Sequence, residues 1–167
     1  AKKLDFYANK SHQIENDIPY PFSKIKKLGE GGFGEVFHVK HCLDDREYAI
    51  KKMTKYDNNV NEIKILSCLN HPNIIRYYSS WNDHYYFFIQ MEYCVMNLRD
   101  YLYKEERNCE IISQIINGLE HLHKKKYVHF DLKPENILLN DEGIVKIADF
   151  GYSRSILESN NISHYYE

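Results

Sequence analysis

The feature that most constrains this chain is a cluster of glycines between two strand-like runs. Residues 29–36 read Gly-Glu-Gly-Gly-Phe-Gly-Glu-Val and match the pattern G-x-G-x-x-G-x-V. Glycines let a backbone lie close to phosphates and point its N–H groups at them. A dinucleotide-binding fold would place such a loop between a strand and a helix. The pattern therefore predicts a phosphate-binding hairpin, with a hairpin turn that binds no ligand as the alternative. The loop residues are Gly29, Glu30, Gly31, Gly32, Phe33 and Gly34.

Hydrophobic spacing predicts five strands and one helix before residue 94. Apolar runs bounded by turn residues indicate the strands, which we expect at 22–28, 35–40, 48–53, 74–81 and 85–93. Residues 58–69 switch to helical spacing, and Asp57 or Asn58 can cap the start of this helix. Its apolar residues recur at every third position, as Val60, Ile63, Leu66 and Leu69.

The second half of the chain is predicted to be mostly helical. We expect a short helix at 97–104, a longer one at 109–125, and two short strands at 137–139 and 145–147. The stripe of the longer helix consists of Ile112, Ile115, Leu119 and Leu122. Residues 141–143, Asp-Glu-Gly, would form a hairpin turn between the two strands. The tail from Ser153 is polar and rich in Ser and Asn, which is typical of a mobile loop.

A lysine on the third predicted strand has one acidic partner within the next helix. Residues 48–51 read Tyr-Ala-Ile-Lys, close to the pattern V-A-I-K. Lys51 alternates with Ala49, so the two would face the same cleft, where a cation can hold phosphates. The acids between residues 52 and 82 are Asp57 and Glu62, and Glu62 lies inside the helix. We therefore pair Lys51 with Glu62, the alternative being a surface lysine and a solvated glutamate.

A third motif follows the longer predicted helix. Residues 129–136, His-Phe-Asp-Leu-Lys-Pro-Glu-Asn, fit H-x-D-L-K-P-x-N. Asp131 would accept or orient the proton of a substrate hydroxyl, and Lys133 would neutralise a transferring phosphoryl group. Asn136 would hold a metal ion, whereas His129 would have a structural role and hydrogen-bond the backbone around this loop.

A fourth motif completes the set. Residues 149–151 read Asp-Phe-Gly and follow a predicted strand. In this context Asp149 would bind magnesium that bridges the phosphates. An isolated match to D-F-G is common by chance, so its value comes from its position after the other three motifs.

In this order the four motifs resemble those of the eukaryotic protein kinase family, from residue 22 to about residue 154. The resemblance implies an α+β, two-lobe fold with a five-stranded antiparallel sheet and one helix in the N-lobe. We expect an N-terminal extension at 1–21, the N-lobe at 22–93 and an incomplete, mostly helical C-lobe at 94–167. ATP would bind between the lobes, with magnesium as the cofactor.

The resemblance also implies which residues hold the adenine of ATP. Met91 would be the gatekeeper, and the backbone from Glu92 to Cys94 would form the hinge that pairs with the base. The side chains expected to enclose the base are Leu28, Val36, Ala49 and Leu138.

The implied reaction is transfer of the γ-phosphoryl group of ATP to a protein hydroxyl, with Ser or Thr expected and Tyr as the alternative. Residues 75–81 and 88–94 are similar to the stress kinases that phosphorylate a translation initiation factor. Phe130, an apolar residue within the third motif, instead looks like the Wee-type kinases that inhibit the cell cycle. The residues leave both branches open.

Two departures from the family pattern affect these expectations. Most members carry Arg where Phe130 stands, and that Arg receives a phosphate from the activation loop in many kinases. We therefore expect activity not to depend on phosphorylation of Ser153, Ser155, Ser159 or Tyr165. No A-P-E motif follows Asp149, so the helix at 109–125 would expose apolar surface. The alternative function is a truncated regulatory module that binds nucleotide or a partner kinase without turnover.

Composition argues against several other classes of function. The formal net charge of −2 gives no strong basic field for nucleic acid or an anionic membrane. The chain contains no apolar run of about 20 residues, the length that a membrane span needs. The four cysteines form neither a C-x-x-C pair nor a zinc-ligand pattern. We expect them to be reduced thiols in a cytoplasmic or nuclear protein.

Overall fold

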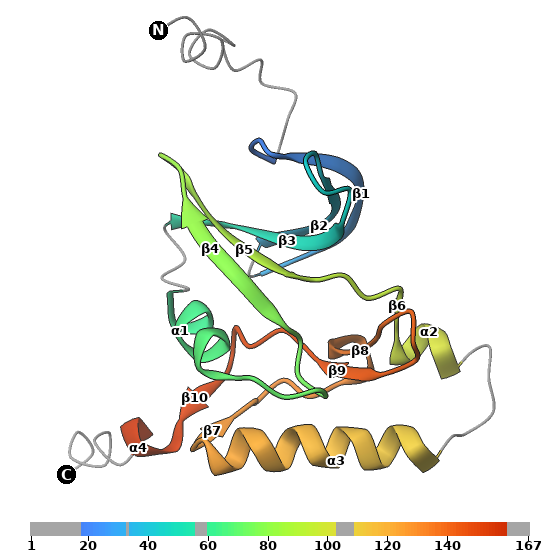
Figure 1. Cartoon of the computed structure of the whole chain (residues 1–167). Coiled ribbons are helices and arrows are strands. Elements are labelled where there is room, and N and C mark those ends of the chain that lie inside the picture. Colours follow the sequence, from blue (N-terminus) through green and yellow to red (C-terminus); the bar gives the residue numbers. More distant parts are fainter. Residues whose placement is uncertain (1–17, 33, 56–59, 103–108, 160–167) are drawn as a thin grey trace, which may run out of the picture.

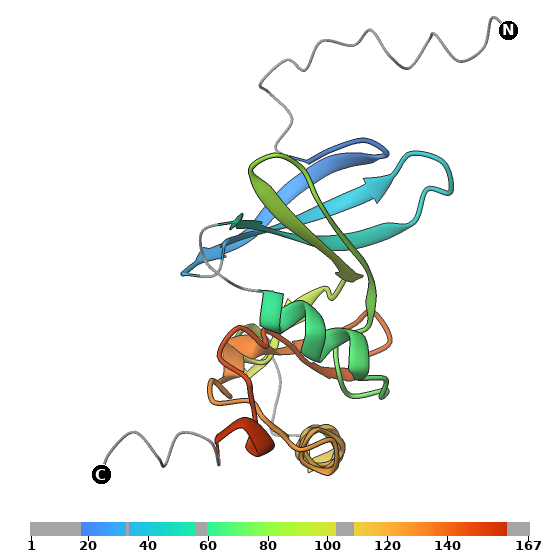
Figure 2. The same ribbon diagram turned by 90° about the vertical axis from the view of Figure 1, so that its left-hand side faces the viewer.

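A computed structural model of the chain describes residues 18–32, 34–55, 60–102 and 109–159. A twisted β-sheet forms one part, and a group of helices and short strands forms the other (Figure 1). Helix α1 lies beside the sheet on the side that faces the second part, which a view from the side also shows (Figure 2). The expected α+β, two-lobe architecture is confirmed.

The sheet has five antiparallel strands in the order β1-β2-β3-β5-β4. Its strands are β1 (Phe22–Gly31), β2 (Gly34–His41), β3 (Glu47–Thr54), β4 (Tyr77–Asn82) and β5 (Tyr86–Glu92). Strands β3 and β5 are central, and their Ile50 and Ile89 are fully buried on the two faces of the sheet. The register pairs Ala49 with Met91, so two residues of the predicted adenine site are cross-strand neighbours.

Helix α1 spans Val60–Cys68 and buries Glu62, Ile65 and Leu66. The expected spacing of three residues was wrong in detail, because Val60 is exposed and Ile65 is buried. A repeat of three drifts around a helix that has 3.6 residues per turn. Residues 58 and 59, and both predicted caps at 57 and 58, lie outside the described residues.

The second part contains the remaining helices and three short β-ladders. In chain order its elements are β6 (Met96–Asn97), α2 (Leu98–Leu102), α3 (Cys109–Lys124), β7 (Tyr127–Val128), a 3₁₀ turn (Pro134–Asn136), β8 (Ile137–Leu139), β9 (Val145–Ile147), β10 (Arg154–Ser155) and α4 (Ile156–Ser159). Strands β6, β8 and β9 form one sheet, and β7 pairs with β10. The predicted long helix and the strands at 137–139 and 145–147 are confirmed, whereas the sequence did not predict β6 or β7. Residues 103 and 104 of the predicted helix at 97–104 lie outside the described residues.

The predicted strand at 74–81 begins only at Tyr77, and the residues before it pack against β9 instead of joining the sheet. Ile74 and Ile75 are buried, and the amide of Ile75 donates a hydrogen bond to Ile147 O of β9 (2.9 Å). Apolar residues in an extended segment therefore belong here to the junction of the two parts rather than to the sheet. Periodicity alone does not distinguish these two cases.

The prediction of a mobile tail from Ser153 was wrong for the described part of that segment. Strand β10 pairs with β7, and the amide of Ile156 donates to Lys126 O (2.8 Å). Ser153 itself is fully buried. A short segment of polar sequence can be ordered by backbone hydrogen bonds to a neighbouring strand, and composition does not report that partner.

The apolar stripe of α3 also differs from the expected one. Leu122 is fully buried, whereas Ile112 and Ile116 are 60% and 59% exposed. Ile111, rather than Ile112, faces the core. Among the described residues, no helix is both long enough and apolar enough to cross a bilayer.

A glycine lets α3 lie close under β9. A β-carbon added at Gly118 would lie 2.8 Å from Asn73 O and 2.8 Å from the side chain of Ile147. The side-chain amide of Asn73 donates to Gln114 of α3 (3.0 Å) and to Val145 O of β9 (3.1 Å). These contacts join the segment after α1 to both α3 and β9.

We predict that Gly118→Ala destabilises the chain by about 1–3 kcal/mol, because the added methyl group overpacks the α3–β9 contact. In an open helix the same change would stabilise by roughly 0.5–1 kcal/mol. The measurement is the free energy of unfolding in urea. Asn117→Ala, at the exposed neighbouring position, is the matched control and is expected to be neutral or slightly stabilising. An increase in stability for Gly118→Ala would show that α3 does not pack this closely.

Candidate active site

A single cleft of about 800 Å³ collects nearly all the residues predicted to act on ATP. It lies between the glycine hairpin, the central strands and the segments around β8 and β9. All of these predicted residues except Phe33 line the cleft, and Phe33 lies outside the described residues. The lining residues that had been predicted are Leu28, Gly29, Glu30, Gly31, Gly32, Gly34, Val36, Ala49, Lys51, Glu62, Met91, Glu92, Cys94, Asp131, Lys133, Asn136, Leu138 and Asp149.

The glycine hairpin forms the cover of this cleft. A β-carbon at Gly29, Gly31 or Gly32 would meet no other atom, so open space lies over the loop backbone. Gly34 has φ +112°, and a β-carbon there would overlap Lys52 O, so this position requires glycine. At the base of the loop, Lys27 Nζ contacts the carboxylates of Glu30 (2.5 Å) and Glu35 (2.7 Å). The backbone N–H groups of such a loop can face phosphate oxygens.

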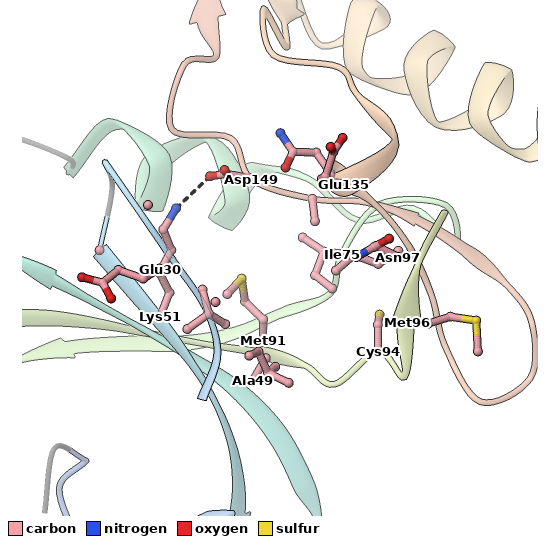
Figure 3. Close-up of a pocket in the computed structure, with 18 of the residues that line it drawn as sticks. Glu30, Ala49, Lys51, Ile75, Met91, Cys94, Met96, Asn97, Glu135 and Asp149 are labelled. Atoms are coloured by element: carbon pink, nitrogen blue, oxygen red, sulfur yellow. Dashed lines mark hydrogen bonds and ion pairs between the residues drawn. The ribbon is translucent and has the colours of Figure 1, made fainter. Parts of the chain in front are cut away.

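The inner wall of the cleft is apolar and rich in sulfur. Ala49, Ile75, Met91, Cys94 and Met96 all line it (Figure 3). Burial raises the pKa of the Cys94 thiol to about 12, so this cysteine is a neutral, apolar wall residue at physiological pH. Such a surface suits the flat face of a purine.

Glu92, at the start of the predicted hinge, uses its amide and its carboxylate to contact neighbouring segments. Its amide donates to Arg76 O (2.9 Å), while its carboxylate accepts from the Arg76 amide (2.7 Å). The same carboxylate pairs with Lys146 of β9 (3.0 Å). Glu92 therefore fixes the connection between the two parts of the molecule, and its N–H is already occupied. Base pairing by the remaining backbone groups from Glu92 to Cys94 stays a prediction.

Lys51 is the central cation of the cleft. It is 5% exposed on β3, and its Nζ lies 2.8 Å from each carboxylate oxygen of Glu62. The Nζ also lies 2.8 Å from Asp149 Oδ1, across the cleft (Figure 3). Burial alone would lower the pKa of Lys51, but the two carboxylates outweigh it and hold this pKa above its ordinary value. Sequence reasoning predicted the contact with Glu62 and missed the one with Asp149.

The segment around Asp131 is held by its own side chains. Asp131 Oδ2 accepts hydrogen bonds from Lys133 Nζ (2.7 Å) and Asn136 Nδ2 (2.9 Å). The hydrogen bond from Lys133, supported by that from Asn136, keeps the pKa of Asp131 below its ordinary value. Asp131 is therefore a carboxylate at neutral pH and can accept a hydrogen bond from a hydroxyl group.

His129 hydrogen-bonds the backbone on both sides of this loop. It is 2% exposed, with Nε2 2.9 Å from Ala148 O, and its Nδ1 accepts from the Asp131 amide (3.3 Å). The contact to Ala148 O requires the proton on Nε2, so this histidine is neutral when both bonds are made. The segments that carry Asp131 and Asp149 are thereby connected.

Two non-glycine residues of the third and fourth motifs have left-handed backbone. Phe130 has φ +63° and Asp149 has φ +62°. Such conformations cost roughly 1–3 kcal/mol each and persist only where the surroundings hold them. At these two positions the surroundings are the hydrogen bonds of His129 and the ion pair to Lys51.

Asn136 and Asp149 fit the coordination chemistry of magnesium. Both offer oxygen atoms and both line the cleft. The Asn136 Nδ2 donates to Asp131 O (2.8 Å) and Oδ2, which leaves the amide oxygen as the atom for a cation. Magnesium commonly uses one or two protein ligands together with phosphate oxygens and water. Among the described residues, no group of three or more His, Cys, Asp or Glu forms a separate metal cluster.

Sequence reasoning missed several polar residues at the mouth of the cleft. Asn97, Asp100 and Glu135 line it, and Glu135 pairs with Arg99 of α2 (2.5 Å). Glu135 occupies a variable position of the third motif, and Asn97 and Asp100 belong to no motif. Asn97 and Asp100 reach the cleft because β6 and α2 follow the hinge in the fold. The local sequence does not predict this arrangement.

Comparisons with known proteins agree with this geometry. A family model described as "Protein kinase domain" matches residues 22–166. The interferon-induced, double-stranded RNA-activated protein kinases of Rattus norvegicus and Mus musculus are 34% and 35% identical to this chain. The alignments cover 94% and 81% of the chain, but 36% and 31% of those proteins. The serine/threonine-protein kinase hippo of Drosophila melanogaster is 34% identical, over 83% of the chain and 22% of that protein.

The chain thus spans about a third or less of the length of these relatives. The family match covers most of the chain and includes every part of the cleft described above. The protein belongs to the eukaryotic protein kinase family.

Proposed function

We infer that the cleft binds ATP with magnesium and transfers the γ-phosphoryl group to a protein hydroxyl. The observation that carries this proposal is the bridge from Lys51 to both Glu62 and Asp149. It places a buried cation beneath the glycine hairpin and beside a carboxylate that can hold a metal. A cation, a metal carboxylate and backbone amides together are the groups that phosphate transfer requires.

In the proposed reaction the substrate hydroxyl oxygen bonds to the γ-phosphorus, and the bond from that phosphorus to the bridging oxygen breaks. Asp131 orients the hydroxyl group and takes its proton as the new bond forms. Its low pKa favours orientation over early proton removal. Lys133, 2.7 Å from Asp131, can turn its positive charge toward the transferring group.

Lys51 would hold the α- and β-phosphates, and Glu62 would keep the lysine in place. Asn136 and Asp149 would hold magnesium, which when bound offsets the charge of the phosphate oxygens. We propose domain limits at residues 21 and 93, with the hinge after Glu92 as the junction.

Several observations support a Ser/Thr acceptor. The hippo relative is named a serine/threonine kinase, as is the relative dst1 of Dictyostelium discoideum, which is 37% identical. The interferon-induced relatives favour the stress-kinase branch over the Wee-type branch. Phe130 remains the feature in common with the Wee-type kinases, so Tyr is retained as the alternative acceptor.

The four described cysteines are free thiols, which supports a cytoplasmic or nuclear location.

One observation favours a second function, in which the chain is a regulatory module without turnover. Ile112 and Ile116 expose apolar side chains one turn apart on α3. Such a surface could pair with a kinase-domain partner. In that case the cleft would bind nucleotide without transferring its phosphoryl group, or would bind no nucleotide.

We predict that magnesium-ATP stabilises the chain against thermal unfolding. At 100 times its dissociation constant, a ligand adds about 2.7 kcal/mol to the free energy of unfolding. Lys51→Met and Asp149→Asn should each lose most of this stabilisation, because they remove the phosphate and metal contacts. The measurement is the Tm with and without magnesium-ATP, and Asn70→Leu, at an exposed position, is a control. A wild-type chain that melts cooperatively but does not respond to magnesium-ATP would contradict ATP binding.

We also predict that the free energy of unfolding decreases as the pH is lowered, because His129 becomes protonated. Burial lowers the pKa of this histidine in the folded state, whereas in the unfolded chain it is near 6.5. Below that value the unfolded state binds the proton more readily, so stability is lost as pH falls. This loss of stability is negligible at pH 8, and between the two pKa values its slope approaches about 1.4 kcal/mol per pH unit for one proton.

The measurement is urea unfolding between pH 8 and pH 5. His129→Asn should flatten the pH dependence, although its stability at pH 8 will be lower. His123→Asn changes an exposed histidine of α3 and should leave the slope unchanged. Equal slopes for wild type and His129→Asn would show that His129 is not held neutral by the fold.

A further inference from the structure

Ser153 joins three functional segments through its own polar atoms. It is 0% exposed, and its amide donates to Phe150 O (3.0 Å). Its hydroxyl donates to His129 O (3.2 Å), in the loop that carries Asp131. Its carbonyl accepts from Asn61 Nδ2 of α1 (3.1 Å). Ser153 therefore lies at the junction of the third motif, the segment after Asp149, and α1.

Asn61 is the neighbour of Glu62 on α1, so this junction reaches the ion pair of the cleft. The amide of Phe150 hydrogen-bonds Glu62, which gives α1 a second contact to the same segment. The Phe150 ring is fully buried and lies 5.0 Å from the His129 ring. A shift of the segment at 150–156 would therefore move the Phe150 amide, which hydrogen-bonds Glu62. It would also move α1, which carries Glu62.

The arginine beside this contact does not belong to the third motif. Phe130 stands where most family members carry an arginine, and its side chain is 67% exposed. The charged side chain at the junction is Arg154, whose Nη1 donates to Ser153 O (2.8 Å) and Gly151 O (3.3 Å). Strand β10 then continues the segment along β7 (Figure 1). Arg154 is therefore hydrogen-bonded to backbone carbonyls of its own segment.

We propose that Asn61 and Ser153 are positioning residues that hold α1, and through it Glu62, in the arrangement that binds magnesium-ATP. We call the hydrogen bonds from Asn61 to Ser153 O and from Ser153 Oγ to His129 O the Ser153 latch. The latch orders the segment at 150–156 in the unphosphorylated chain. This inference rests on the proposed ATP-dependent function of the cleft. Because Ser153 is fully buried, it does not serve as an activating phosphorylation site.

The test uses amide hydrogen exchange on the unphosphorylated 167-residue chain, without nucleotide, together with the dissociation constant of magnesium-ATP. Asn61→Leu keeps the approximate size of the side chain and suits a helix, but it cannot donate to Ser153 O. Ser153→Ala removes the hydroxyl group and keeps the backbone. The matched control is Asn70→Leu, the same substitution at an exposed position just after α1.

Asn61→Leu and Ser153→Ala should each raise the exchange rates of the amides at 150–156 about threefold to tenfold, as expected for the loss of one hydrogen bond. Each should also weaken magnesium-ATP binding by at least about twofold, because a smaller fraction of the chain is in the competent state. Asn70→Leu should change neither quantity. Exchange rates for Asn61→Leu equal to those of the control would overturn the latch.

Faster exchange with an unchanged dissociation constant would overturn the positioning role, because the segment would then be anchored without affecting the cleft. If the wild-type chain does not bind magnesium-ATP, the proposed function fails. The exchange rates without nucleotide still decide whether the latch exists. The two failures are therefore distinguishable.

Discussion

Three buried or half-buried charges determine the shape of the cleft. Lys51, Glu62 and Asp149 come from β3, from α1 and from the segment after β9, so one ion-pair network fixes three elements that are far apart in the sequence. Glu62 is 2% exposed, and a carboxylate buried so deeply without a cation would be strongly unfavourable. Removing one partner from such a pair typically costs about 3–5 kcal/mol. The elements can therefore pack closely only when the lysine and its two carboxylates come together.

Elsewhere in the cleft, neutral hydrogen bonds act together with the ion pair of Asp131 and Lys133. His129 fastens the loop of Asp131 to Ala148 O, directly before Asp149. Asn73 fastens the segment after α1 to α3 and β9. The hydrogen bonds of His129 and the ion pair of Asp149 with Lys51 hold the left-handed backbone at Phe130 and Asp149. Donors and charges held in place before the reaction are what phosphate transfer requires of a protein.

The sequence predicted most of this fold because its motifs are local and their order is informative. The glycine hairpin, the lysine on the third strand and the loop of Asp131 each follow from a few adjacent residues. Glu62 could be assigned to Lys51 because Asp57, the other acidic residue before the next strand, lies at the start of the helix. The contact between Lys51 and Asp149 could not be assigned in this way, because it joins positions 98 residues apart.

The errors share a physical cause. Ile74 and Ile75 have the composition of a strand, but they pack at the junction with β9. Ser153 has the composition of a loop, but its hydroxyl group and its backbone are buried. Each of these contacts joins residues that are distant in the sequence, and neither propensity nor periodicity predicts such a partner.

The most direct test of the account is transfer of the labelled γ-phosphate of ATP to peptides that carry Ser, Thr or Tyr as the single acceptor. We expect magnesium-dependent labelling of the Ser and Thr peptides by the wild-type chain. Asp131→Asn should bind magnesium-ATP equally well but transfer at least about a hundredfold more slowly. A chain that binds magnesium-ATP and labels none of the peptides would contradict the enzymatic account and favour the regulatory module.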